Sequence, residues 1–220
     1  MIPLSDDTRI RRFPFATLAL IAANLWVYFG WQEQVGIEES VQLAGFVPIE
    51  LTRHLPGGLT HLFTAMFMHG GLMHLAGNLW FLWIFGRTVE SDTGLVRFLA
   101  FYLLAGVAAT LAHTWSEPLS RLPLVGASGA ISGVLGAYLV KHPTASIRTF
   151  IPIWIFFRIV EIPACLFLFI WIGIQVLSQA AAHGHRGGGV AFMAHIGGFV
   201  AGSVLILLLQ ERDSRRREVE

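Results

Sequence analysis

The chain has 220 residues and a formal net charge of +1, and 55% of its residues are hydrophobic while only 13% are charged. Soluble domains carry about 25% charged residues, so this composition, with a mean hydropathy of +0.64, excludes a soluble globular protein. The basic residues form no patch that would predict a nucleic-acid partner, and the single cysteine, Cys165, excludes an internal disulfide and argues against a cysteine-based metal site.

Apolar runs of the length that spans a bilayer as a helix recur along the whole chain. They predict an all-α polytopic membrane protein, a bundle of six transmembrane helices in one domain over residues 1–220, with short tails at 1–12 and 210–220. In chain order, the expected spans are residues 15–31, 62–85, 98–112, 126–140, 162–177 and 190–209. The first run has no small-residue cleavage site behind it, so we expect a retained span and not a signal peptide.

Six spans place both termini on the same side of the membrane. Most Lys and Arg residues lie in segments on that side, as in residues 9–12 and 212–217, and cytoplasmic segments carry such an excess. We therefore expect both termini in the cytoplasm. The long connection at residues 32–61 then lies on the outer side, where its apolar composition predicts a loop that partly enters the bilayer.

Three of the expected spans carry polar side chains, which are costly in a bilayer and are therefore candidates for function. The second span carries His74 and Asn78, which are four residues apart and share one helix face. Ser128 lies near the outer end of the fourth span, and His195 lies about one and a half turns into the sixth. Because these three spans run in the same direction, we expect the four side chains at similar depth near the outer surface.

Small residues predict that the fourth and sixth spans pack closely against each other. Each of the two spans carries a Gly-x-x-x-Gly pair, formed by Gly129, Gly133, Gly198 and Gly202. If these faces meet, the Ser128 hydroxyl and the His195 imidazole come within hydrogen-bond reach, which is the minimum for a base-activated nucleophile. His74 and Asn78 are then candidate donors to a developing oxyanion.

Each of these residue types also has a more ordinary role in membrane proteins. A serine in a span often hydrogen-bonds its own backbone, Gly-x-x-x-Gly is common in helix packing, and a histidine in a span also serves packing or an ion path. A proton-coupled transporter would need histidines and glycine-broken helices as well. Against a transporter, the sequence contains no inverted repeat and no carboxylate near the middle of a span.

Two stretches resemble the nucleophile and base motifs of the rhomboid intramembrane serine proteases. GASGA, residues 126–130, is similar to the family's Gly-x-Ser-Gly motif around the nucleophile, here Ser128. AHIGGFVAG, residues 194–202, is similar to the motif on the sixth core helix that carries the catalytic base, here His195.

Two further stretches resemble the same family. HGGLMHLAGN, which ends at Asn78, is similar to the second-helix motif and contains its histidine at His74. GRTVESDTG, residues 86–94, resembles the family's Gly-x-x-x-Glu-x-x-x-Gly turn, with the glutamate at Glu90. The motifs occur in the family's order, and the resemblance covers residues 14–209.

The resemblance implies a serine endopeptidase with a Ser–His dyad, no aspartate, no metal and no cofactor. Ser128 would attack the scissile carbonyl and His195 would take the proton. The oxyanion would be held by Asn78, His74 and the backbone N–H of Ser128, with Gly126 helping to position the substrate. The implied substrates are single-span transmembrane proteins, and membrane lipids surround the enzyme.

The resemblance also implies an integral multi-pass protein whose active site opens to the extracytoplasmic side. Short loops without appended domains are typical of a prokaryotic cell (inner) membrane. Substrates are expected to enter laterally past the fifth span, with candidate gate or lipid-facing residues Phe157, Phe167, Phe169 and Trp171. The alternative function is a catalytically silent rhomboid-like protein that binds membrane clients; such proteins tend to lack the serine, the histidine or both. The sequence predicts no oligomeric state.

Two positions depart from the family pattern. Thr60 and His61 stand where Trp-Arg is common ahead of the second span, which leaves the anchoring of that loop open. Ser132 stands where an aromatic residue often packs on the ring of the base. We therefore expect another group, such as the Ser132 hydroxyl, to hold His195.

Overall fold

The computed structural model describes residues 1–153, 156–182 and 191–209, so the expected tail at 210–220 lies outside the described residues. Four helices in this part of the chain are long and apolar enough to cross a membrane, at residues 15–35, 95–116, 164–181 and 192–209. The mostly helical architecture agrees with the expected class, whereas six spans remain a prediction because the other helices do not reach this length and hydropathy.

The first span is longer than expected. It begins at Phe15, as predicted, and continues as one helical segment. The segment consists of α1 (Phe15–Val27), a π-helical turn (Tyr28–Gln32) and α2 (Glu33–Val35). It ends at Gly36, whose φ of 101° suits glycine.

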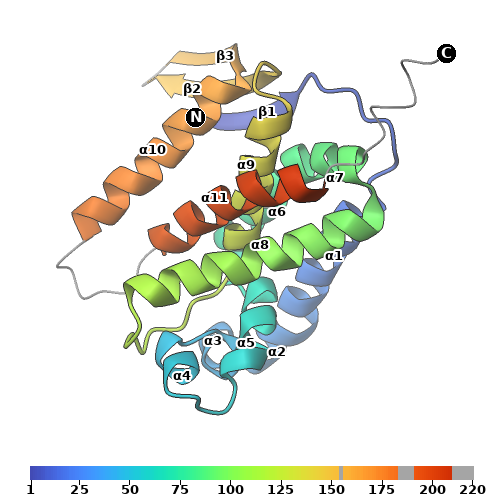
Figure 1. Cartoon of the computed structure of the whole chain (residues 1–220). Coiled ribbons are helices and arrows are strands. Elements are labelled where there is room, and N and C mark those ends of the chain that lie inside the picture. The colour runs from blue at the N-terminus through green and yellow to red at the C-terminus, as the bar shows by residue number, and fades with distance from the viewer. Residues whose placement is uncertain (154–155, 183–190, 210–220) are drawn as a thin grey trace.

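The connection that follows is a group of short helices packed on a small core of its own. The elements are α3 (Ile37–Ala44), α4 (Pro48–Thr52), α5 (Gly58–Thr64) and a 3-10 turn (Ala65–Phe67). The core contains Phe46, Leu62 and Ala65, and Figure 1 shows these helices gathered at the bottom of the molecule.

The limits of the predicted span at 62–85 are wrong. The backbone is extended at Met68 and has a φ of 154° at Gly71, so the helix that carries the site residues starts only after this break. It runs through α6 (Leu72–Phe81), a π-helical turn (Leu82–Gly86) and α7 (Arg87–Thr93). Both sides of the break are apolar, and the hydropathy pattern therefore ran across it.

Four longer helices complete the bundle. They are α8 (Leu95–Ser116), α9 (Ser128–Lys141), α10 (Ala164–Ala182) and α11 (Phe192–Leu209). Against the expected spans, α8 extends further at both ends, α9 starts only at Ser128, α10 starts after Pro163, and α11 starts at Phe192. Figure 1 shows α8 and α11 side by side across the middle of the bundle, with α10 leaning outward along one flank.

The core of the bundle surrounds α9. Every residue from 130 to 138 is buried, as expected for a helix that is apolar on all sides. The ring of Tyr138 meets the ring of Phe85 edge-on at 5.0 Å, and Phe98 and Phe199 belong to the same cluster. From its first turn to Tyr138, α9 is therefore held by a packed core.

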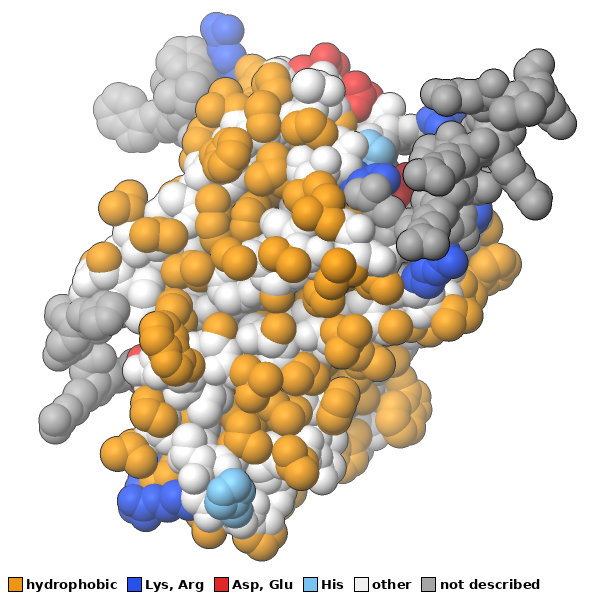
Figure 2. Space-filling view, in the orientation of Figure 1, with side chains coloured by type: hydrophobic (Ala, Val, Ile, Leu, Met, Phe, Trp, Pro, Cys, Tyr) orange, Lys and Arg blue, Asp and Glu red, His pale blue; other side chains and the backbone are white. Residues whose placement is uncertain are grey.

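The outside of the bundle is apolar as well. Figure 2 shows hydrophobic side chains spread over the middle of this face, with Lys and Arg mostly toward its ends. Considered over the whole surface, exposed apolar residues include Trp26, Val96 and Leu208, each at least 71% exposed. Such a surface fits lipid and not water.

A three-stranded antiparallel sheet corrects the expectation of an all-α chain. The strands are β1 (Ile2–Asp6), β2 (Ser146–Ile153) and β3 (Phe156–Pro163), in the order β1-β2-β3. Ile2 lies opposite Phe150, and Ser146 lies opposite Pro163. Residues 1–12, expected only as a tail, thus contribute a strand.

Two carboxylates tie this end of the molecule together. Glu90 on α7 accepts hydrogen bonds from the backbone N–H groups of Ala16 and Thr17 and from the Thr17 hydroxyl, each 2.7 Å long. It therefore caps the positive N-terminal end of α1.

The second carboxylate, Asp6 on β1, accepts from Arg87, Thr88 and the Tyr138 hydroxyl at 2.9 Å each. Because Tyr138 is on α9, this cluster links the N-terminal strand to the central helix.

Candidate active site

Ser128 is the first residue of α9 and follows a sharp turn. Gly126 makes this turn possible: its φ is 119°, and a Cβ there would lie 2.8 Å from the His74 ring. The Gly126 N–H donates to the carbonyl oxygen of Ala65 over 2.9 Å, which fixes the turn against the short helices. The first N–H groups of a helix lack intrahelical partners and carry partial positive charge, and the N–H of Ser128 is one of them.

The two glycine pairs lie at the contact between α9 and α11. A Cβ added to Gly198 would overlap the backbone of Gly129, and one added to Gly202 would overlap the backbone of Gly133. The helix backbones therefore touch, which any larger residue at these positions would prevent. On another side of α9, a Cβ on Gly129 would lie 2.8 Å from the side chain of Ala109 on α8.

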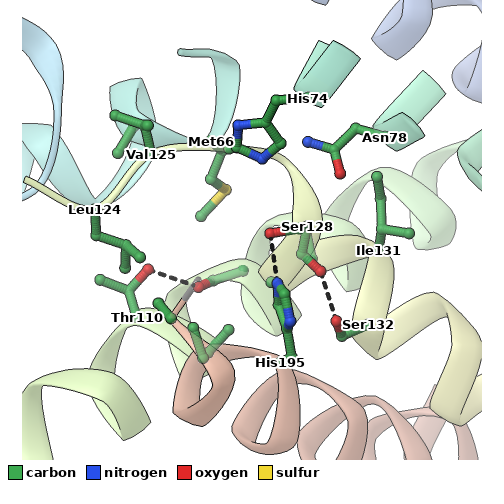
Figure 3. Close-up of a pocket in the computed structure, with 18 of the residues that line it drawn as sticks. Met66, His74, Asn78, Thr110, Leu124, Val125, Ser128, Ile131, Ser132 and His195 are labelled. Atoms are coloured by element: carbon green, nitrogen blue, oxygen red, sulfur yellow. Dashed lines mark hydrogen bonds between the residues drawn. The ribbon is translucent and has the colours of Figure 1, made fainter. Parts of the chain in front are cut away.

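This contact brings the predicted nucleophile and base together. The Oγ of Ser128 lies 2.8 Å from the Nε2 of His195, as the dashed line between them in Figure 3 marks. At this distance the hydroxyl can donate to an unprotonated ring nitrogen, as general-base catalysis requires.

The other nitrogen of the imidazole has a partner that sequence reasoning missed. The Nδ1 of His195 lies 2.7 Å from Oε1 of Gln175 on α10. Trp171, one turn earlier on the same helix, places its ring 6.0 Å from the imidazole. The available signal was a lone amide within the apolar fifth span, four residues after a tryptophan.

The role suggested for the Ser132 hydroxyl is therefore not supported by its contacts. It donates to the carbonyl oxygen of Ser128 over 2.6 Å, within α9. Gln175 and Trp171 contact His195 instead.

His74 and Asn78 on α6 complete the site. Figure 3 shows both on the opposite side of Ser128 from His195. The Nδ2 of Asn78 is buried and has no hydrogen-bond partner among the residues that the structure describes. The Gly70 N–H approaches the Nδ1 of His74 at 3.5 Å, which favours the ring proton on Nε2, and this nitrogen would lie 2.8 Å from a Cβ at position 126. Both side chains thus offer donors beside the turn before Ser128.

These groups share one cavity of about 750 Å³. Its walls are mostly apolar and include Met73, Phe81, Leu124 and Phe192, with the Ser128 hydroxyl among the few polar groups. Its volume lies within the usual range for ligand sites, roughly 300–1,000 Å³.

One of the two unusual residues ahead of the second span, His61, anchors the short helices. The Nδ1 of His61 lies 3.1 Å from a carboxylate oxygen of Glu50, so α5 is tied to α4. The question of loop anchoring that the sequence left open thus has a structural answer at His61.

The four candidate gate residues take different positions. Phe167 is 2% exposed in the core, Trp171 lies beside His195, and Phe169 is 62% exposed on α10. Phe157 belongs to β3 and not to a span.

The chemistry available to the site follows from these contacts. No cluster of three His, Cys, Asp or Glu side chains able to hold a metal is found among the described residues. The site combines a serine hydroxyl, an imidazole within hydrogen-bond distance of it, the buried amide of Asn78 and the half-buried ring of His74 in an apolar cavity, and this set suits acyl transfer.

Comparisons with known proteins give a consistent result. A family model described as Rhomboid domain matches residues 56–212. The chain is 33% identical over 193 residues to Rhomboid protease GluP of Bacillus subtilis (strain 168), which covers 87% of this chain and 35% of that protein.

Two other relatives are similar at the same level. Rhomboid-like protein 11, chloroplastic, of Arabidopsis thaliana is 30% identical over 87% of this chain and 64% of its own length. Putative rhomboid protease YdcA of Bacillus subtilis (strain 168) is 31% identical over 60% of this chain and 65% of its own length. The chain thus spans about a third to two thirds of the length of these relatives.

Proposed function

Since the chain belongs to the rhomboid family, we propose that it is an intramembrane serine endopeptidase with Ser128 as nucleophile and His195 as general base. The observation that carries the proposal is the 2.8 Å contact between Ser128 Oγ and His195 Nε2. The names of two relatives, Rhomboid protease GluP and Putative rhomboid protease YdcA, support the same reaction.

In the first half of the reaction, Ser128 Oγ attacks the scissile carbonyl carbon while His195 Nε2 takes the hydroxyl proton. The tetrahedral intermediate collapses when the imidazolium gives this proton to the leaving amine. The carbon–nitrogen bond breaks, and an acyl ester on Ser128 remains.

Charge on the intermediate is held by donors beside the turn. The Nδ2 of Asn78, the Nε2–H of His74 and the backbone N–H of Ser128 would bind the oxyanion, and Gly126 gives the substrate backbone room beside them. A buried donor with no other partner in the described protein is worth most here, because it needs no rearrangement as the charge develops.

In the second half, water attacks the ester while His195 takes its proton. The imidazolium then returns a proton to Ser128, and the acid product leaves. Nucleophile and base both come from this chain, so the proposed reaction needs no cofactor and no metal.

The length of α9 supports a site recessed in the membrane. Its 14 residues rise about 21 Å, less than the roughly 30 Å of a hydrocarbon core. With Lys141 at the cytoplasmic boundary, Ser128 would lie below the outer surface. We propose that α9 and the rod from α6 to α7 also cross the membrane, giving six spans in a single domain.

The proposed setting is a prokaryotic cell membrane, with both termini in the cytoplasm and the cavity open to the extracytoplasmic side. The proposed substrates are single-span membrane proteins, because only a segment in or near the bilayer can reach a recessed serine. The four long apolar helices support an integral membrane protein.

The test is cleavage of a model single-span substrate by the purified protein, together with labelling by a fluorophosphonate probe. We expect wild type to cleave and to be labelled, and Ser128→Ala and His195→Ala to do neither while keeping their thermal stability. Ser203→Ala is the matched control, because this hydroxyl donates to Phe199 within α11 and does not line the cavity.

The alternative, a catalytically silent client-binding protein, predicts that wild type neither cleaves nor is labelled but still retains a single-span client. Equal cleavage by wild type, Ser128→Ala and His195→Ala would contradict the assignment of both residues.

A further inference from the structure

We propose that Gln175 is a positioning residue that holds the His195 imidazole in the tautomer and orientation that the reaction needs. The inference deepens the proposed function and rests on it. It starts from the 2.7 Å contact between Gln175 Oε1 and His195 Nδ1, on the side of the ring away from Ser128.

The chemistry of the contact sets the position of the ring proton. An amide oxygen only accepts hydrogen bonds, so the proton of the neutral imidazole is held on Nδ1. The lone pair on Nε2 is then directed at the Ser128 hydroxyl, 2.8 Å away. The opposite tautomer would offer the serine a donor and could not accept its proton.

A neutral amide suits this position. A charged carboxylate in an apolar membrane site is strongly disfavoured, whereas an amide orients the ring without a charge. Trp171 packs beside the same imidazole from one turn earlier, so a single face of α10 makes both contacts.

The two halves of α10, which supplies these contacts, differ in how much of their surface is buried. At its start, Ala164, Phe167 and Leu168 are buried in the core. Further along, Ile174 and Leu177 are 53% and 71% exposed, and a Cβ at Gly173 would meet nothing within 4 Å. Only 17% of the α10 span is buried, against 28% to 39% for the other three long helices.

Gln175 therefore reaches His195 from the loosely held half of α10. Figure 1 shows this part of the helix diverging from the rest of the bundle. Outward displacement of that half would remove the acceptor from Nδ1 without moving α9 or α11. The ring is correctly held only while α10 is docked.

The experiment measures the rate of fluorophosphonate labelling of Ser128 and the kcat and KM of substrate cleavage. Gln175→Leu removes the acceptor at similar volume, and Gln175→Asn withdraws it by about one carbon–carbon bond, 1.5 Å. Gln175→Glu keeps an acceptor oxygen at the same reach, because the apolar site favours the neutral carboxylic acid, whose carbonyl oxygen still accepts a hydrogen bond. Gln179→Leu removes the same amide one turn further along α10, outside the cavity, and is the matched control.

We expect Gln175→Leu and Gln175→Asn to lower the labelling rate and kcat about tenfold or more, with KM within about twofold of wild type. Gln175→Glu should recover most of the lost rate, and Gln179→Leu should behave like wild type. A merely structural role would lower the thermal stability of the variants and give no recovery by glutamate.

Labelling of Gln175→Leu or Gln175→Asn at the wild-type rate would overturn the inference while leaving the dyad intact. If wild-type protein is not labelled, or if Ser128→Ala still cleaves, the proposed function fails and the inference fails with it.

Discussion

Two regions hold His195, and they are packed in opposite ways. Toward Ser128, α9 and α11 touch through their glycine backbones, and α9 is buried at every position from 130 to 138. Toward α10, the contact is one hydrogen bond and one ring, from a helix of which only 17% is buried. The tight region sets the distance between Ser128 and His195, the proposed nucleophile and base, and we infer that the loose region sets the orientation of the imidazole. A fixed distance between two catalytic groups therefore does not by itself fix their alignment.

The largest effect should come from breaking the tight region. Gly202→Ala places a Cβ where the backbone of Gly133 already lies, so α9 and α11 must separate. A displacement of about 1 Å at the reacting groups lowers rates about 100-fold, and we expect at least this loss in fluorophosphonate labelling, with a lower thermal unfolding temperature. Gly173→Ala on α10 is the control, because its Cβ would meet nothing within 4 Å. Normal labelling of Gly202→Ala would show that the helix contact is not as rigid as described.

Asn78→Ala tests the proposed oxyanion donors, which α6 places beside the turn before Ser128. Loss of one oxyanion donor lowers kcat roughly 100- to 1,000-fold in serine proteases. Since Asn78 Nδ2 has no partner among the described residues, thermal stability should stay close to wild type. A large loss of stability with little loss of kcat would assign Asn78 to packing.

Glu90→Gln tests whether the end of the bundle that is distant from Ser128 affects the rate of the proposed reaction. The substitution removes the charge that caps α1 and turns an amide donor toward the N–H groups of Ala16 and Thr17. We expect the free energy of unfolding to fall by about 1–3 kcal/mol, with kcat per folded molecule unchanged. Glu39→Gln, at an exposed position, is the control for the loss of charge. A changed kcat would couple this end to the site.

The smallest effect should come from Ser132→Ala. Among the described residues, the Ser132 hydroxyl bonds only the Ser128 carbonyl within its own helix, a contact worth about 1 kcal/mol, so kcat should fall about fivefold or less. Comparison with Gln175→Leu in the same assay decides which side chain holds His195. A larger loss in Ser132→Ala than in Gln175→Leu would reverse the assignment.

The parts of the site that could be predicted are those that depend on short sequence motifs and on the spacing of residues within one helix. The Gly-x-x-x-Gly pairs report on how near two backbones can come, so the approach of Ser128 to His195 followed from them. The i, i+4 spacing of His74 and Asn78 put both on one helix face in the same direct way.

Features that depend on contacts between distant segments could not be predicted. Gln175 looked like an ordinary residue of an apolar span, because its contact with His195 depends on which side of α10 faces α11. The break at Gly71 was hidden because apolar residues flank it, although the preceding Gly70 was a visible sign.

The sheet was missed for a similar reason. The run from 146 to 163 is rich in Ile and Phe and contains Pro152 and Pro163, a composition that fits strands better than a helix. It leads without interruption into α10, and hydropathy alone placed its last residues in the fifth span.

The pairing of β1 also constrains the order in which segments of the protein fold during synthesis. Asp6 accepts one of its hydrogen bonds from Tyr138, 132 residues later, and β1 pairs with a strand that follows α9. During synthesis, α1 can enter the membrane long before β2 has been synthesised. The residues of β1 therefore remain unpaired until then. Pairings between such distant segments form slowly. A bulky tag fused directly to Met1 should therefore delay maturation more than it weakens the finished molecule.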